Sequence, residues 1–413
     1  MKKNILLLII AVILTGGIIV YIVNPNDIFN KKDETLIIPK TIENTNDFNA
    51  SIIRAINTNS NYILSPYSLE VALNMLRDGA NGTSQEEIAN VLSSREMKDL
   101  RVKDKIGIAN AAFIKKDYKD LVKLSYYNTL NNQYHAEIIY DEFKDPTIIN
   151  DWVKKNTNDM IEKIIDQMDP DFAMGLINAV AIDVKWESPF ECINTTGDIF
   201  TMADGEKIQT EMMHKTFKYS GSYFNNEEVE GIIIPYETFD NSDVALEFVA
   251  MLPKGNLSSF ISGITQDKLN NIDINASQAG EKYNIRVALP RFSYEYSVNN
   301  LIDIFRKMGI KEVFEKNADL SNIFDNSPNK FYVNQAIHKA KIELNEKGTK
   351  AAALTFFAIA GNALVMEPPK VQEINFDRPF AYLIRDAKSK EIMFFGSVYE
   401  PNLWNGSTCD NEM

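Results

Sequence analysis

The sequence is poor in the residues from which metal and redox centres are usually built. It contains three histidines and two cysteines among 413 residues. Zinc sites use those residue types at short spacings, whereas Cys192 and Cys409 lie far apart with no C-x-x-C motif. The sequence therefore offers little room for a metal centre. It leaves open whether the two cysteines pair.

Motifs for catalysis and for nucleotide binding are also missing. G-x-S-x-G, H-E-x-x-H, G-x-x-x-x-G-K-[ST] and G-x-G-x-x-G do not occur. A hydrolytic triad with scattered members would still need a base, and His135, His214 and His338 lie in no recognisable catalytic motif. We therefore expect a protein that is not an enzyme and that binds no cofactor.

Positive charge is in deficit, because the formal net charge is -14. Nucleic acid is bound by clustered basic residues, and the sequence has no such cluster, so we expect no nucleic-acid partner. The chain is 45% hydrophobic and 24% charged, which is typical of a globular protein with a large core.

One long apolar run is present, from Ile5 to Val23, directly after Lys2 and Lys3. A helix needs about 20 apolar residues to cross a bilayer, and no A-x-A cleavage signature follows the run. We expect residues 1–24 to be an uncleaved signal anchor, with a cleaved signal peptide as the alternative. Either would place the rest of the chain outside the cytoplasm.

The rest of the chain reads as one domain. Residues 25–45 are polar with two prolines and are typical of a tether, and no linker or repeat interrupts residues 46–404. Residues 405–413 form a short tail.

The start of this domain is predicted to be helical. Ser65 and Ser68 are candidate caps of a helix that we expect to end at Gly79. Thr83 to Glu86 form a candidate capping box for the next helix.

Short apolar strands bounded by Pro, Gly or charge dominate from about residue 178 onward, with one further helix predicted at about 298–309. Helices mostly first and strands mostly later indicate an α+β fold with large antiparallel or mixed sheets.

Residues 345–369, NEKGTKAAALTFFAIAGNALVMEPP, fit neither a helix nor a strand. The alanines favour a helix, but Phe356, Phe357 and Gly361 form no helical stripe, and no polar alternation fixes a buried strand face. Proline cannot donate to a sheet ladder, so Pro368 and Pro369 would end any strand here.

Six blocks of the sequence resemble the signatures of serpins, in the same order, across residues 46–401. These blocks are NYILSPYSLEVALNMLRDGANGTSQEEI, INAVAIDVKWESPF, ALEFVAMLPKG, VALPRFSYEYSVNNLIDIFRKMGIKEVF, AIHKAKIELNEKGTKAAALT and FDRPFAYLIRDAKSKEIMFFGSVYEP. The resemblance implies three β-sheets, eight or nine helices and an exposed reactive-centre loop at about residues 348–369. It also implies a monomer whose partner is a target protease: the protease forms an acyl-enzyme with the loop, and the cleaved loop then inserts into the main sheet.

The residue types in the hinge of the loop distinguish an inhibitory serpin from a non-inhibitory serpin that acts as a binding or chaperone protein. By resemblance the hinge comprises Glu346, Gly348, Thr349, Ala351, Ala353 and Thr355. Its inward set, which starts at Thr349, is small or β-branched, whereas non-inhibitory members tend to place charged, bulky or proline residues there. We therefore expect an inhibitor. Serpins usually carry an acidic residue where Lys350 stands and a small one where Leu354 stands, and both departures fall on the outward face.

The scissile bond implied by the usual distance from the hinge is Asn362–Ala363. The segment between the hinge and Pro379 is several residues longer than in most members of the family. Counting back from Pro379 therefore moves the predicted bond towards Met366, and Leu364–Val365 and Met366–Glu367 remain alternatives. No Arg or Lys lies between Thr355 and Met366, so we expect an apolar-preferring protease rather than a trypsin-like one. Elastase-, chymotrypsin- and subtilisin-like serine proteases fit, as does a cysteine protease with an apolar subsite.

Two further groups match control positions of the family. One is a polar cluster expected under the middle of the main sheet: Ser65, Ser68, Asn178 and His338. The other is Lys185 with Trp186, where the loop would first enter; simple capping and core packing are the alternative readings. Asp183 and Val184 stand where the family commonly has Lys and Gly.

Overall fold

The computed structural model describes residues 8–14, 17–23, 47–92, 97–325, 331–349 and 370–401, and the chain divides into two units, Met1–Thr45 and Asn46–Met413. In the first unit, strands β1 (Leu8–Leu14) and β2 (Gly17–Val23) pair antiparallel. This differs from the expected helix. Apolar runs rich in β-branched Ile and Val suit a strand as well as a helix. No helix in the described ranges combines the length and apolar character needed to cross a membrane.

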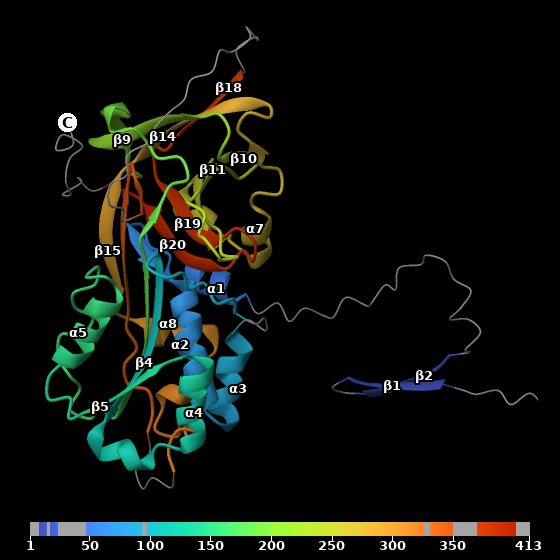
Figure 1. Ribbon diagram of the computed structural model, residues 1–413, viewed down its shortest axis with the longest axis vertical. Helices are drawn as coiled ribbons and strands as arrows, with labels where there is room; N and C mark the ends of the chain where they lie inside the picture. The colour runs from blue at the N-terminus through green and yellow to red at the C-terminus, as the bar shows by residue number, and fades with distance from the viewer. Residues whose placement is uncertain are drawn as a thin grey trace, which may run out of the picture. The chain divides into compact units, whose positions relative to one another are not determined.

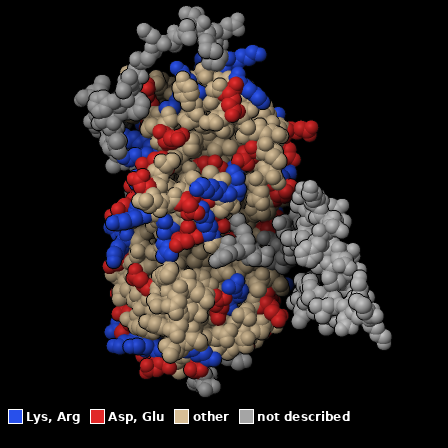
Figure 2. Space-filling view, turned by 45° about the vertical axis from the view of Figure 1, so that its right-hand side comes forward, with Lys and Arg blue, Asp and Glu red and all other residues tan. Residues whose placement is uncertain are grey.

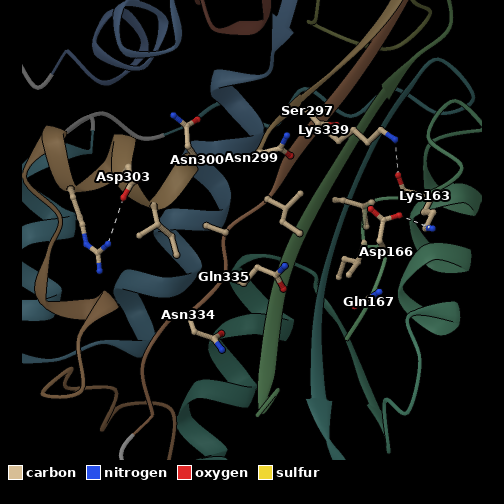
Figure 3. Close-up of a pocket in the computed structure, with 16 residues that line it drawn as sticks. Lys163, Asp166, Gln167, Ser297, Asn299, Asn300, Asp303, Asn334, Gln335 and Lys339 are labelled. Carbon is tan, nitrogen blue, oxygen red and sulfur yellow. Dashed lines mark hydrogen bonds and ion pairs between the residues drawn. The ribbon is translucent and has the colours of Figure 1, made fainter. Parts of the chain in front are cut away.

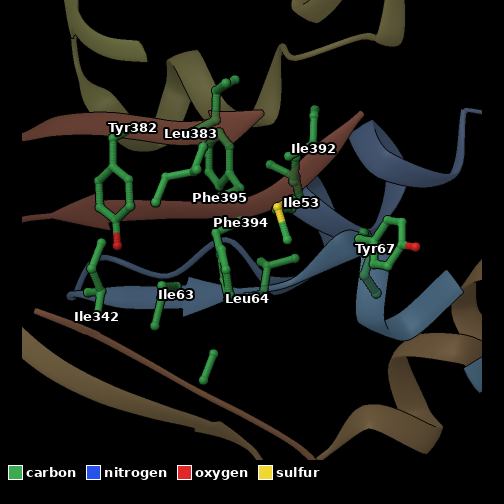
Figure 4. Close-up of a cluster of buried hydrophobic side chains, with 14 of the residues drawn as sticks. Ile53, Ile63, Leu64, Tyr67, Ile342, Tyr382, Leu383, Ile392, Phe394 and Phe395 are labelled. Atoms are coloured by element: carbon green, nitrogen blue, oxygen red, sulfur yellow. The ribbon is translucent and has the colours of Figure 1, made fainter. Parts of the chain in front are cut away.

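The core of the second unit is a seven-stranded sheet. Its order is β13 (Ser277–Gln278), β10 (Ser222–Asn225), β11 (Val229–Pro235), β12 (Leu246–Pro253), β19 (Phe380–Asp386), β20 (Ile392–Val398) and β3 (Tyr62–Leu64). Every residue of β12, β19 and β20 is buried, which explains their nearly continuous apolar sequences. Figure 4 shows Tyr382, Phe394 and Phe395 from β19 and β20 in one buried hydrophobic cluster with Ile63 and Leu64 of β3.

A four-stranded sheet caps one end of the molecule in Figure 1. Its order is β18 (Lys370–Asn375), β14 (Tyr283–Pro290), β9 (Lys207–Phe217) and β8 (Thr195–Thr201). β18 is parallel to β14, whereas the other pairs are antiparallel.

The main sheet consists of two hydrogen-bonded halves. One half has the order β5 (Glu137–Asp141), β4 (Ile106–Lys115) and β6 (Met174–Ile182). The other has the order β15 (Phe292–Val298), β16 (His338–Asn345), β17 (Gly348–Thr349) and β7 (Val184–Lys185). β7 follows β6 after the single residue Asp183, so one continuous chain segment joins the halves. Elsewhere in the described ranges no pairing joins β6 to β16, and we call the gap between them the slot.

The described ranges contain the following helices: α1 (Phe48–Ile56), α2 (Pro66–Gly79), α3 (Gly82–Val91), α4 (Leu124–Gln133), α5 (Thr147–Asn156), α6 (Leu257–Ser262), α7 (Gln266–Asn271) and α8 (Leu301–Met308). Short 3-10 turns occupy Lys116–Leu121, Cys192–Asn194 and Glu312–Phe314. The predicted cap at Ser65 is present, because its side chain accepts a hydrogen bond from the Ser68 amide. The capping box at Thr83 is not: the N-cap of α3 is Asn81, two residues earlier, and the helix begins at Gly82.

The main sheet is covered on both faces. On one face α5 packs Ile149, Trp152 and Val153 against side chains of β4 and β6. On the other face α2 lies against β6 and against β20 of the seven-stranded sheet. Acidic and basic side chains are interspersed over the face of the molecule seen in Figure 2. The predicted α+β fold is confirmed, and the described part of the second unit has three sheets if the two halves of the main sheet count as one.

Candidate functional site

The hinge enters the main sheet at Gly348 and Thr349. After β16 the chain turns at Glu346 and Lys347 and returns as β17, which pairs antiparallel with both β16 and β7. Gly348 is required here because its φ is +151° and a Cβ atom would clash with the Val184 carbonyl oxygen. Gly348 and Thr349 therefore already lie between β16 and β7.

Thr349 points into the protein interior. Its exposed fraction is 1%, and its Oγ1 atom lies 2.7 Å from the Tyr236 hydroxyl. Burial raises the pKa of Tyr236 far above neutrality, so its hydroxyl stays uncharged and serves as donor or acceptor. The structure thus places Thr349 on the inward face that the sequence assigned to it.

Trp186 fixes the turn that precedes the hinge. Its indole stacks on Tyr236 with ring centroids 4.6 Å apart, and its Nε1–H donates to the Asn345 carbonyl oxygen at 2.9 Å. The Trp186 backbone N–H donates to the Lys347 carbonyl oxygen at 3.0 Å. Both bonds hold the chain where β16 ends, so Trp186 does more than fill the core.

The backbone of Lys185 is held from its other side by Glu237. The Lys185 N–H donates to the Glu237 carboxylate at 3.2 Å, and the Lys185 carbonyl oxygen accepts from the Glu237 N–H at 2.8 Å. Lys105 pairs with the same carboxylate. β7 is therefore anchored before the hinge reaches it.

Glu346 links the hinge to the four-stranded sheet. Its carboxylate is 4% exposed, accepts a hydrogen bond from Thr195 Oγ1 at 2.7 Å and pairs with Arg291 at 3.3 Å. Arg291 also pairs with Glu211 at 2.6 Å. A buried carboxylate is tolerated only when it is paired and hydrogen-bonded, and both conditions are met here.

The four residues of the predicted polar cluster come together around a small cavity of about 20 Å³ at the slot. The Ser65 N–H donates to His338 Nε2 at 3.0 Å, and Ser68 Oγ donates to the Asn178 carbonyl oxygen at 3.2 Å. Burial lowers the pKa of His338 to about 4, so the ring is neutral and Nε2 can accept. In the described part of the chain, the buried Asn178 Oδ1 has no hydrogen-bond partner.

A larger cleft of about 660 Å³ adjoins this cavity, because Ile164 and Lys339 line both. It lies between the segment after α5, the start of α8 and the segment that leads into β16 (Figure 3). Lys339 Nζ crosses the cleft to donate to the Lys163 carbonyl oxygen at 2.8 Å. The polar cluster at the slot is therefore next to a cleft with both polar and apolar walls.

Several predicted residues fall outside the described part of the chain. They are Ala351, Ala353 and Thr355 of the hinge, the candidate bonds Asn362–Ala363, Leu364–Val365 and Met366–Glu367, and Cys409.

The sequence analysis missed Tyr236, Glu237 and Arg291, which surround the hinge. Tyr236 and Glu237 directly follow the apolar strand β11, where polar residues are common and indicate no particular role. Their roles arise from contacts with Thr349 and Lys185, which are distant in the sequence.

Comparisons with known proteins agree with this architecture. A family model described as "Serpin (serine protease inhibitor)" matches residues 43–401. Human neuroserpin is 28% identical over 389 residues, covering 87% of this chain and 91% of neuroserpin. Iripin-2 of Ixodes ricinus is 30% identical over 389 residues, covering 87% of this chain and 93% of Iripin-2. The crystal structure of a thermophilic serpin, tengpin, in the native state superimposes with a TM-score of 0.75 at 28% identity, covering 89% of this chain and 96% of tengpin.

Proposed function

The chain belongs to the serpin family, and we propose that it is an irreversible suicide-substrate inhibitor of serine endopeptidases. The target protease attacks the loop between residues 350 and 369, its serine oxygen bonds to the scissile carbonyl carbon, and the new amino terminus leaves. The loop then inserts into the slot before water can hydrolyse the ester. A cysteine protease with an apolar subsite would follow the same course through a thioester.

The observation that carries this proposal is the state of the main sheet at the hinge. β17 has sheet partners on both sides, whereas β6 and β16 remain unpaired with each other along the slot. A further antiparallel strand would give both of them ladder partners. The residues that follow Thr349 could therefore form a strand in the slot and pair with both β6 and β16.

The register of β17 indicates where an inserted loop would reach the polar cluster. Thr349 lies opposite Leu344 on β16 and Val184 on β7, so in an inserted loop each further residue would lie opposite residues one lower on both neighbours. With that register kept, Thr355, six residues on, would lie opposite His338 (344 − 6) and Asn178 (184 − 6). The loop would then bring a short hydroxyl side chain to the level of the buried Asn178 amide.

The inward set also fits the interior that it would enter. On β16 the residues at alternate positions from His338 to Leu344 are buried. Thr349, Ala351, Ala353 and Thr355 would face the same side, and none carries a charge. The lack of Arg and Lys up to Met366 favours elastase-, chymotrypsin- or subtilisin-like targets, with Asn362–Ala363 as the first candidate bond.

The test is to incubate the protein with one protease of each class and to look for a covalent complex that survives boiling in detergent. We expect a complex with at least one protease, together with a released peptide whose first residue locates the bond between Gly361 and Glu367. The same protease with its catalytic serine replaced by alanine is the matched control and should give no complex. Cleavage of the loop by every protease without any complex would overturn the proposal.

We also infer, from the sequence of residues 1–23, that the chain is exported. Lys2 and Lys3 before an apolar run are typical of an export signal. Fractionation of producing cells with sequencing of the mature amino terminus tests this. An intact terminus in the membrane fraction supports anchoring, a terminus beyond residue 23 in the medium supports cleavage, and a cytoplasmic protein contradicts export.

A further inference from the structure

The cleft beside the polar cluster is large enough to hold a ligand and is separate from the slot. Its volume of about 660 Å³ lies within the range of sites that take small molecules, about 300–1,000 Å³. Its walls come from the segment after α5, the start of α8 and the residues before β16 (Figure 3). In the described part of the chain, no residue of β6 lines it. A ligand in the cleft would therefore lie beside the slot and not between β6 and β16.

The charged side chains that line the cleft are already paired. Their ion pairs are Lys163–Asp166 at 2.6 Å, Lys339–Glu295 at 2.7 Å, Arg306–Asp303 at 3.6 Å and Arg306–Glu315 at 2.9 Å. A charged ligand would have to compete with these partners for its own ion pair. The cleft is therefore better suited to an uncharged ligand.

Amide side chains supply the polar groups that are still open. Within the described ranges, the side chains of four residues that line the cleft have no hydrogen-bond partner: Gln167, Asn299, Asn300 and Gln335. Each amide offers two N–H donors and one acceptor oxygen. A ligand that carries both donors and acceptors can therefore pair with either wall of the cleft.

The main chain that leads into β16 is also unpaired. The Val333 N–H still donates to the Val313 carbonyl oxygen at 2.9 Å. Beyond it, the backbone groups of Asn334, Gln335 and Ala336 have no hydrogen-bond partner among the residues that the structure describes. These three residues belong to no helix, strand or turn. Open main-chain groups of this kind can pair with the main chain of a bound peptide.

We propose that this cleft binds a short uncharged peptide. Its main chain pairs with the open backbone of residues 334–336 and with the amide side chains of the cleft. Its apolar side chains contact Ile164, Ile302 and Ile337, which line the same space. Every residue of a peptide offers one donor and one acceptor together with a side chain that can be apolar, which matches this mixture of walls. The site needs neither the reactive-centre loop nor its insertion.

The test measures pulsed hydrogen exchange of the full chain, alone and with peptide at millimolar concentration. The probe is a mixture of acetylated and amidated tetrapeptides built from alanine, serine, threonine, valine and leucine. The same mixture with N-methylated peptide bonds is the matched control, because it keeps the side chains and loses the donors. The open amides of residues 334–336 should exchange rapidly in the free protein. With the probe they should slow about three- to tenfold, as expected when the peptide exceeds its Kd by a similar factor.

Two variants remove single amides from opposite parts of the cleft. Gln335→Leu and Asn299→Leu should each weaken binding of the probe about three- to tenfold, because each deletes hydrogen bonds to the peptide. Asn128 is exposed on α4 and does not line the cleft, so Asn128→Leu is the matched control and should bind like the unaltered protein.

Slower exchange at residues 334–336 that both cleft variants weaken would support the peptide site. No slowing with the probe, or equal slowing with the N-methylated mixture, would overturn it. Slowing in β6 instead would place the peptide in the slot and refute the assignment to the cleft. Maltotriose is measured in parallel, and a larger effect of this neutral sugar than of the peptides would contradict the proposed class of ligand.

Discussion

The replacement Thr349→Arg isolates the step at which the hinge enters the sheet. Thr349 is 1% exposed and contacts the buried hydroxyl of Tyr236, so a larger cationic side chain would have to be buried without a partner. Arginine stays charged at any accessible pH and cannot escape the cost by losing its proton. Leaving one uncompensated charge in an interior costs about 3 to 5 kcal/mol.

This cost falls on the inserted state. In the intact protein only Gly348 and Thr349 are in the sheet, so we expect the variant to release these two residues to solvent and keep the rest of its fold, whereas the cleaved loop must carry residue 349 inside. Each 1.4 kcal/mol changes a ratio about tenfold, so trapping should fall by a factor of about 100 or more. The protein should then behave as a substrate.

The assay is titration of an inhibited protease, with complex and cleaved protein separated on denaturing gels. Thr349→Arg should give almost only cleaved protein, while its urea midpoint in the intact form stays close to that of the unaltered chain. Thr349→Ser keeps the hydroxyl and serves as the matched control, with most of the trapping retained. A Thr349→Arg protein that traps as well as the unaltered one would show that β17 is not the start of the inserted strand.

Three further predictions concern neighbouring residues. Burial holds the pKa of His338 at about 4 against its ordinary 6.5, so below pH 6.5 the unfolded chain binds a proton that the folded protein excludes. Stability should fall by about 2 to 3 kcal/mol from pH 7 to 4.5, and His338→Gln should weaken that fall in urea unfolding; an unchanged slope would contradict the assignment. Gly348→Ala puts a Cβ atom against the Val184 carbonyl oxygen at a φ of +151°, so complex yield should drop while the intact protein still folds; full yield would refute the pairing of β17. Glu346→Gln removes the charge that faces Arg291 and should lower intact stability by about 1 to 3 kcal/mol in urea, and no change would mean that this pair adds nothing.

Much of the fold follows from local sequence pattern. The apolar run that starts at Val244 contains strand β12, and the helix predicted at about 298–309 appears as α8, ended by Gly309 with a φ of +117°. Both depend on periodicity and on caps, which are local. Residues 331–337 are not in a strand, and Asn334 to Ile337 instead line the cleft before β16 begins at His338.

The site was only partly predictable. The resemblance identified Ser65, Ser68, Asn178 and His338, and the structure brings these residues around one cavity. It could not supply the division of the main sheet into two halves, because strand pairing between distant segments has no local signature. The apolar run after Lys3 forms strands β1 and β2 instead of the predicted helix for a related reason: helix and strand patterns coincide in a fully apolar segment.

The most direct test of the account compares the unfolding temperature of the intact protein with that of the protein nicked once between residues 361 and 366. If the loop fills the slot after cleavage, the nicked form gains a complete main sheet and should unfold at a markedly higher temperature than the intact form. Equal unfolding temperatures, or a lower one for the nicked protein, would contradict the account.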